Sequence, residues 1–312
     1  MKWKINCLLV CLLLSVFTAS ASEADCGTIR FAIREIRPLS AEINAGVALT
    51  GKVLQTQDWT TETTTSLMKA ALVPMQGIQG LISRLNTLSG LSSAASVATL
   101  SGKIAENLKP CLALCSEILA CTAIGNPHQN GNLEKARSAL ASLEISLTPP
   151  LAELETLAGE SRRHVLTALG AEAEKQLKAQ EFPMQYNMLY IRKLNEKMDE
   201  IAAVDPFGTT EVERLTKAAE HALDTAIDSA EYTVNEAYFL SSSDDFAQLA
   251  DAILKCFCKS KNLLGTLADV LHTPDILSST ESLKLIKDSY QAYSSGISSA
   301  PDQMETLLKS IR

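Results

Sequence analysis

Residues 246–271 read FAQLADAILKCFCKSKNLLGTLADVL, and this stretch decides the fold. Its apolar side chains recur three, four or seven residues apart, which is the spacing of one face of an α-helix. They are Phe246, Leu249, Ile253, Phe257, Leu264, Leu267 and Leu271. The segment is therefore expected to form a helix with one buried stripe.

Two further stripes extend this pattern to either side. One has mostly small side chains, which let a neighbouring helix approach closely: Val212, Leu215, Ala219, Ala222, Ala226, Ala230 and Ala237. The other runs toward the C-terminus: Ile276, Leu283, Ile286, Tyr290, Tyr293 and Ile297. A helix over residues 210–239 would be about 45 Å long. Because no stretch shows the alternation of a β-strand, the sequence predicts an all-α protein, an elongated multi-helix bundle.

Proline- and glycine-rich positions divide the stripes into about nine or ten helices. The main breaks are expected at Pro74, at Pro149-Pro150, at Pro183 and over Asp205 to Gly208. The polar stretch Gly125 to Asn132 is the best candidate for a boundary between two halves, 22–125 and 132–312. A long loop within a single bundle is the alternative.

The N-terminus has the pattern of a secretory signal peptide. Lys2 and Lys4 precede the apolar run 5–17, and Ala19-Ser20-Ala21 supplies small residues for cleavage. The apolar run is shorter than the roughly 20 residues of a membrane span, so a transmembrane anchor is disfavoured. Residues 1–21 are predicted to be removed, which leaves a secreted chain that begins at Ser22.

The charge balance excludes two classes of partner at this stage. The chain has 312 residues and a formal net charge of −8, and loss of the two signal-peptide lysines leaves −10. Nucleic acids and anionic membrane surfaces attract clustered lysine and arginine, and the sequence has no basic run. Neither is expected as a partner, and no stable membrane anchor is expected.

Six cysteines remain in the secreted chain, and they are predicted to form disulfides, as is usual outside the cell. They are Cys26, Cys111, Cys115, Cys121, Cys256 and Cys258. Neighbouring cysteines in each pair point in directions that disfavour a bond within the pair. The expected topology is a hub in which residues 111–121 bond to Cys26 and to the 256–258 segment. A metal site is the alternative, but zinc-ribbon spacing is absent and no metal is expected.

No motif for catalysis appears in the chain. Nucleophile elbows, phosphate loops, metalloprotease helices and dinucleotide fingerprints are all absent. The four histidines, His128, His164, His221 and His272, lie in no recognised motif. An enzyme is therefore not expected, nor is a cofactor. The expected role is binding or structural, with an extracellular protein as the partner.

Two features keep alternatives open. Met184, Met188 and Met198 share one stripe after Pro183, which indicates either gap-filling core or an apolar pocket. The pocket would make the protein a carrier of an apolar small molecule or lipid between helices.

Residues 70–102 contain a single charge, Arg84. A buried helical hairpin is the favoured interpretation, and a membrane-active protein is the minor alternative.

Overall fold

The computed structural model describes residues 2–55, 61–92, 94–122, 131–271 and 280–312. Within these ranges the regular structure is helical and includes no strand, which confirms the all-α prediction. The chain divides into two compact units, Met1–Leu169 and Gly170–Arg312.

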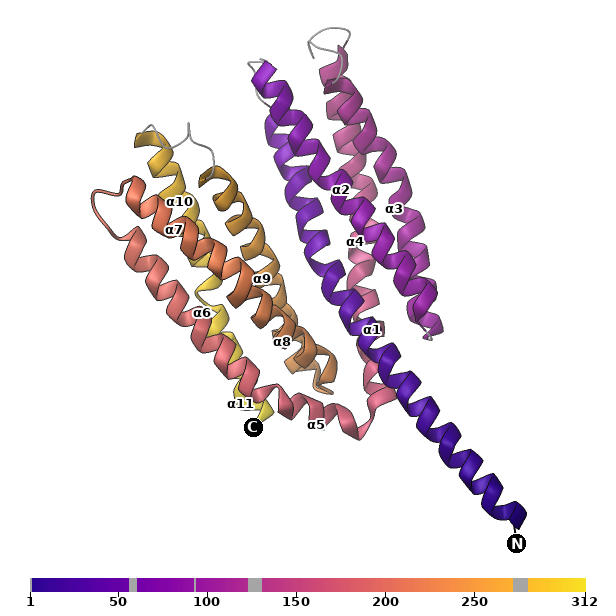
Figure 1. Ribbon diagram of the computed structural model, residues 1–312. Coiled ribbons are helices and arrows are strands. Elements are labelled where there is room, and N and C mark those ends of the chain that lie inside the picture. Colours follow the sequence, from indigo (N-terminus) through magenta and orange to yellow (C-terminus); the bar gives the residue numbers. More distant parts are fainter. Residues whose placement is uncertain (1, 56–60, 93, 123–130, 272–279) are drawn as a thin grey trace. The chain divides into compact units, whose positions relative to one another are not determined.

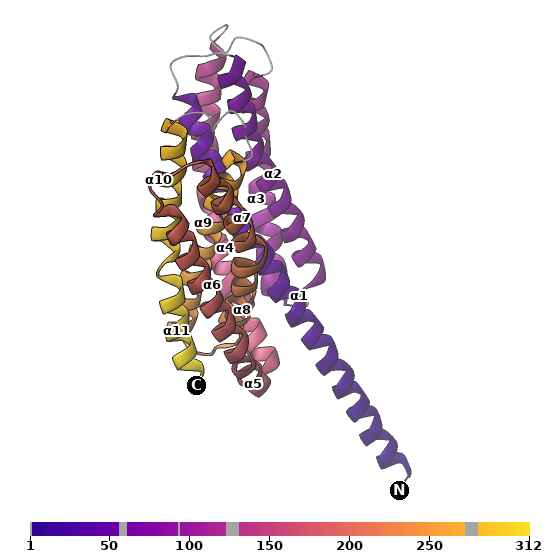
Figure 2. The ribbon, with the colours of Figure 1, turned by 60° about the vertical axis from the view of Figure 1, so that its left-hand side comes forward.

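The first unit is an antiparallel four-helix bundle (Figure 1). Its helices are α1 (Lys2–Leu54), α2 (Thr61–Leu91), α3 (Ala95–Thr122) and α4 (Asn132–Leu169). Each helix packs against the next, and α4 returns to α1. The N-terminal part of α1 extends beyond the ends of the other three helices in both views (Figures 1 and 2).

Polar contacts toward the two ends of the first bundle fix the register of α1 against α4. The Arg137 guanidinium donates to the carbonyl oxygen of Leu54 at 2.9 and 3.2 Å, so it satisfies an otherwise unpaired acceptor at the end of α1. Near the opposite end, His164 Nε2 lies 3.1 Å from Asp25 Oδ2. The two contacts together align α1 and α4 along the length of the bundle.

Glycines allow α1 and α2 to approach closely. A Cβ atom added at Gly46 would lie 2.6 Å from Pro74 Cδ, and one added at Gly77 would lie 2.7 Å from Ile43 Cγ1. Real Cβ atoms essentially never come this close to another heavy atom. The α1–α2 seam therefore depends on glycine at both positions.

The helices of the first unit run through prolines that were expected to end them. Helix α2 contains Pro74, and α4 contains Pro149 and Pro150. A proline inside a helix removes one hydrogen bond and costs about 3 kcal/mol or more. Leu147 and Leu154 are nevertheless buried on both sides of the Pro149-Pro150 pair. The packing of α4 along its whole length therefore outweighs the local cost of the two prolines.

The second unit is also a bundle of four rods, each rod made of one or more helices. The first rod is α5 (Ala171–Ala179) with α6 (Glu181–Ala202). The second is α7 (Thr209–His221), a π-helical turn (Ala222–Ile227) and α8 (Asp228–Leu240). The third is α9 (Asp244–Leu271), and the last is α10 (Thr280–Ile297) with α11 (Ala300–Ile311). The described chain thus has eight continuous rods, against the nine or ten helices expected.

The predicted apolar stripes form the core of the second unit. On α9, Ile253, Phe257 and Leu264 are fully buried. The small-residue stripe also points inward, and its alanines are buried: Ala219, Ala222, Ala226, Ala230 and Ala237. These small side chains bring the α7–α8 rod close to α9, which packs against both helices.

The division between the units lies at Gly170 rather than in the stretch from Gly125 to Asn132. Gly170 has a φ of 53°, a left-handed conformation that favours glycine and ends α4. The polar stretch instead joins α3 to α4 inside the first unit, and residues 125–130 lie outside the described residues. The loop alternative for this stretch therefore fits the structure.

The weakly charged segment 70–102 belongs to the α2–α3 hairpin of the first bundle. Ile78, Leu81, Leu85 and Val97 are fully buried there. Among the residues that the structure describes, no helix combines the length and apolar character that a membrane crossing requires.

Candidate functional site

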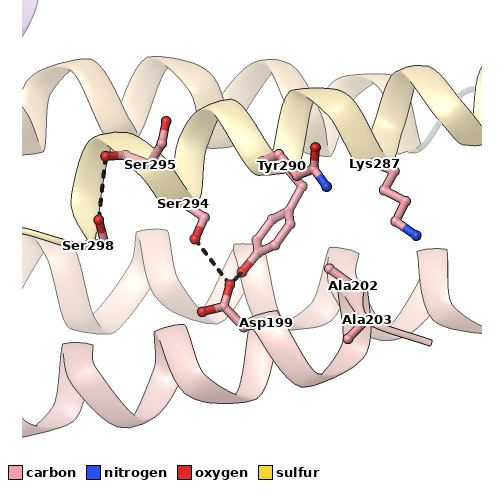
Figure 3. Close-up of a pocket in the computed structure, with 9 residues that line it drawn as sticks. Asp199, Ala202, Ala203, Lys287, Tyr290, Ser294, Ser295 and Ser298 are labelled. Atoms are coloured by element: carbon pink, nitrogen blue, oxygen red, sulfur yellow. Dashed lines mark hydrogen bonds between the residues drawn. The ribbon is translucent and has the colours of Figure 1, made fainter.

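A polar groove of about 530 Å³ lies between α6 and α10 of the second unit (Figure 3). Its volume is within the range typical of small-molecule sites. The lining residues are Asp199, Ala202, Ala203, Lys287, Tyr290, Gln291, Ser294, Ser295 and Ser298. Most of them come from one face of α10, where the apolar stripe gives way to serines.

Asp199 is the centre of the groove (Figure 3). Its Oδ1 atom accepts a hydrogen bond from the Tyr290 hydroxyl at 2.8 Å and a second from the Ser294 hydroxyl at 3.1 Å. Tyr290 and Ser294 are four residues apart, so both donors lie on the same face of α10. Asp199 Oδ2 accepts no hydrogen bond from another described residue.

Burial and the carboxylate act together on the two tyrosines of this face. Desolvation is the main cause that raises the pKa of Tyr290, and the hydrogen bond to Asp199 raises it further. Desolvation also raises the pKa of Tyr293, with smaller contributions from Cys256 and Asp199. Both phenols therefore keep their protons at neutral pH.

This arrangement suits recognition better than proton transfer. A general acid or base works best when its pKa lies near the operating pH, whereas the pKa of Tyr290 is shifted away from neutrality. Ser294 donates its proton to Asp199, and the described residues that line the groove include no histidine to act as base. The groove instead offers a carboxylate held in a fixed position by two donors.

The position of Asp199 within α6 indicates what the groove attracts. The residue lies in the last turn of α6, and this turn contains no basic residue. Carboxylates near the C-terminus of a helix are destabilised by the negative end of the helix dipole. A cationic group bound at Asp199 Oδ2 would relieve this repulsion, because it would offset both negative charges.

The predicted methionine stripe lies in the core of the second unit. Met184 and Met198 are fully buried, and Met188 is 6% exposed. None of the three lines the α6–α10 groove. Their burial fits the gap-filling interpretation, and the apolar pocket stays a prediction.

The predicted disulfide hub is wrong for Cys26. Lys103 and Glu153 form an ion pair at 2.7 Å and so lie at one level of the first bundle, whereas Asp25 and His164 pair eleven residues further along α4. Cys111 lies eight residues beyond Lys103 in the opposite direction along the axis. At 1.5 Å per residue, Cys26 and Cys111 are therefore roughly 27 Å apart along the bundle axis.

A disulfide requires Cα atoms no more than about 7 Å apart, so Cys26 does not reach Cys111. Cys115 and Cys121 lie still further along α3 in the same direction. Every version of the hub needs one of these three bonds. In the structure no disulfide joins any two of these six cysteines.

Four of these cysteines lose their thiol protons less readily than an exposed cysteine does. Burial is the main cause that raises the pKa of Cys115 to about 11, and it also raises the pKa values of Cys111, Cys121 and Cys256. The Cys256 thiol also donates to the Gly296 carbonyl oxygen at 2.9 Å. Within the described residues, no cluster of histidine, cysteine and carboxylate side chains is arranged to hold a metal ion.

Two of the four histidines lie within the described residues. His164 pairs with Asp25 in the first unit, and His221 is hydrogen-bonded to the Tyr190 hydroxyl in the second. The other two, His128 and His272, lie outside the described residues. Sequence analysis anticipated neither contact, because each joins side chains that are far apart in the chain.

The Asp199 groove was also missed by sequence analysis. Tyr290 was placed in an apolar stripe, and the pattern is right because Tyr290 is only 2% exposed. Its hydroxyl, however, needs a partner, and the partner comes from a helix 91 residues earlier in the chain. Comparisons with protein-family models, with curated proteins and with solved structures find no match to this chain.

Proposed function

We propose that the protein is a secreted, extracellular helical protein that binds a partner, and that it is not an enzyme. The observation that carries the proposal is Asp199, held by the Tyr290 and Ser294 hydroxyls in a groove open to solvent, with its Oδ2 atom available. The partner is an extracellular protein or a small ligand that presents a cationic group to this carboxylate.

Export is supported by the N-terminal sequence and by the position of the predicted signal in α1. The N-terminal part of that helix extends past the other three helices of the first bundle, so its removal leaves the four-helix core intact (Figure 2). The bundle contact nearest to the predicted cleavage point is the pair Asp25 and His164, and Asp25 lies after Ser22.

Expression in a secreting cell tests the compartment. The expected product is found in the medium and begins at Ser22, as determined by N-terminal sequencing and intact mass. A chain that keeps Met1 and remains with the membrane fraction would overturn the secretory part of the proposal.

Binding at the groove is tested by comparing matched variants. Asp199→Asn keeps the shape and removes the charge, whereas Ser295→Trp fills the groove. Ser310→Trp adds the same side chain at an exposed serine of α11 and serves as the control. The bait is the purified protein, immobilised and exposed to the extracellular fluid of its source.

We expect wild type and Ser310→Trp to recover equal amounts of a partner. Both groove variants should recover at least tenfold less of it. Equal recovery by all four proteins would contradict recognition by Asp199. Native mass spectrometry of the same samples tests the carrier alternative. An apolar ligand that stays bound to wild type and to both groove variants would support a carrier instead.

A further inference from the structure

A second groove, of about 310 Å³, follows the seam between α6 and α7 on the second unit. It is distinct from the Asp199 groove and shares no lining residue with it. The lining residues are Leu194, Lys197, Ile201, Arg214, Lys217, Ala218 and His221. Basic side chains are thus concentrated in one small groove of an acidic protein.

The basic side chains come from two helices. Arg214 and Lys217 are three residues apart on α7, and Lys197 faces them from α6. These three residues form no ion pair and no hydrogen bond with any other described residue. By contrast, Arg192 of α6 pairs with Asp302 at 2.9 Å. The lining of the groove contains three cations and no carboxylate, which raises the local potential for an anion.

The groove also has apolar side chains in its lining and an aromatic contact at one end. Leu194, Ile201 and Ala218 lie between the cations and are almost fully buried. At one end the Tyr190 hydroxyl is hydrogen-bonded to His221 Nε2, and the two rings meet edge to face at a centroid distance of 5.7 Å. A ligand in this groove therefore contacts apolar atoms as well as charges.

An exposed aromatic stripe continues from Tyr190 along α6. Tyr186 stacks on Tyr190 with a centroid distance of 6.1 Å, and Phe182 follows one turn further. Phe182 is 76% exposed and Tyr186 is 60% exposed. Large apolar side chains clustered on a surface mark a site of interaction.

We propose that the α6–α7 groove binds a single-chain amphipathic anion. Its carboxylate or phosphate head lies among Lys197, Arg214 and Lys217, and its aliphatic chain runs past Tyr190 onto Tyr186 and Phe182. Arginine suits both head groups because its guanidinium forms bidentate hydrogen bonds with planar or tetrahedral oxyanions. The inference does not depend on what binds at Asp199.

A single amphiphile fits this surface better than an extended anionic membrane does. The chain has a net charge of −8, so a large negative surface repels most of the protein. Exposed carboxylates such as Glu196, Glu200 and Glu213 lie within one turn of Lys197 or Arg214 on the same two helices. A small anion inside the groove is affected mainly by charges within about one Debye length, roughly 8 Å.

The charge requirement is tested by calorimetric titration with sodium decanoate, compared with decanamide, its uncharged analogue. Decanoate is expected to bind wild type at least tenfold more tightly than decanamide. The double variant Arg214→Gln, Lys217→Gln is expected to lose at least tenfold in decanoate affinity. The control is Lys259→Gln, Lys284→Gln, which changes the net charge equally at exposed lysines outside the groove and should bind as wild type.

The chain requirement is tested with anions of different length. Tyr186 lies eleven residues before Lys197 on α6, about 16 Å along the helix axis, which is further than a ten-carbon chain reaches. Affinity for wild type is therefore expected to rise at least threefold from decanoate to hexadecanoate, because the additional methylene groups contact the aromatic stripe. The double variant Phe182→Ser, Tyr186→Ser should abolish this rise and leave decanoate binding unchanged. Both altered side chains are exposed, so circular dichroism and thermal unfolding should match those of wild type.

Three outcomes would overturn the inference. The first is that decanamide binds as tightly as decanoate. The second is that the Arg214 and Lys217 variant binds as wild type. The third is that soluble decanoate does not bind while phosphatidylglycerol vesicles do. The last outcome would assign the surface to a membrane instead. None of these outcomes affects the Asp199 variants, so failure here is distinguishable from failure of the proposed function.

Discussion

Gly46→Ala probes the closest approach in the first bundle. The new Cβ would lie 2.6 Å from Pro74 Cδ, 2.9 Å from Pro74 N and 2.9 Å from Val73 Cγ1. Carbon atoms in contact are optimally about 3.5–4.0 Å apart, so α1 and α2 must separate by about 0.9 Å or more at this point. The proline ring and backbone are rigid and offer no rotamer that relieves the contact.

The expected change in the free energy of unfolding combines two opposing effects. Overpacking of a tight seam costs about 1–3 kcal/mol. Replacing glycine by alanine inside a helix returns about 0.5–1 kcal/mol. We therefore expect Gly46→Ala to destabilise the first unit by up to about 2.5 kcal/mol.

Gly159→Ala is the matched control, because a Cβ added at Gly159 within α4 meets no atom within 4 Å. This variant should stabilise the protein by up to about 1 kcal/mol through helix propensity alone. Urea unfolding followed by circular dichroism measures both variants, and a shifted midpoint at unchanged slope isolates the stability change. If Gly46→Ala is as stable as Gly159→Ala, the close approach of α1 and α2 is refuted.

Three further outcomes are expected. Met188→Ala should lower the free energy of unfolding by about 2–5 kcal/mol, measured by urea titration, because Met188 is buried in the second unit; an unchanged midpoint would contradict core packing. The pKa of Cys115 is raised to about 11, so its thiol should react with iodoacetamide at pH 8 about 100-fold more slowly than the thiol of free cysteine does. Mass spectrometry measures the rate of labelling, and rapid labelling would refute the burial of Cys115. The free energy of unfolding should fall as pH rises above about 10, because the unfolded chain releases the Tyr290 and Tyr293 protons while the folded state, in which both pKa values are raised, retains them. In unfolding titrations at different pH values, the double variant Tyr290→Phe, Tyr293→Phe should show a smaller fall.

The helical stripes were predictable because their information is local. The spacing of Ala219, Ala226 and Ala230 places small side chains along one face of the α7–α8 rod. All three are buried in the structure. Spacing along a helix depends only on the geometry of 3.6 residues per turn, which is the same in every bundle. The sequence pattern therefore predicted both the element and the buried face.

The ends of the rods were less predictable. Local preference disfavours Pro149 and Pro150 inside a helix, but contacts along the whole of α4 keep it continuous. Gly170 lies in a helical pattern with no linker composition around it, yet its left-handed backbone separates the two units. In each case the deciding contacts join residues that are far apart in the chain. Local sequence patterns therefore do not predict them.

The same reasoning explains why both grooves escaped sequence analysis. The Asp199 groove needs a hydroxyl from α10, and the α6–α7 groove needs Lys197 beside two cations of another helix. Net charge argued against nucleic acids and anionic membrane surfaces as partners, but it averages over the whole chain. A bound anion instead responds to the charges within about one Debye length, roughly 8 Å, and there the folded chain places Arg214, Lys217 and Lys197 together. An acidic chain is thus compatible with a local anion site, provided that folding brings together cations that the sequence keeps apart.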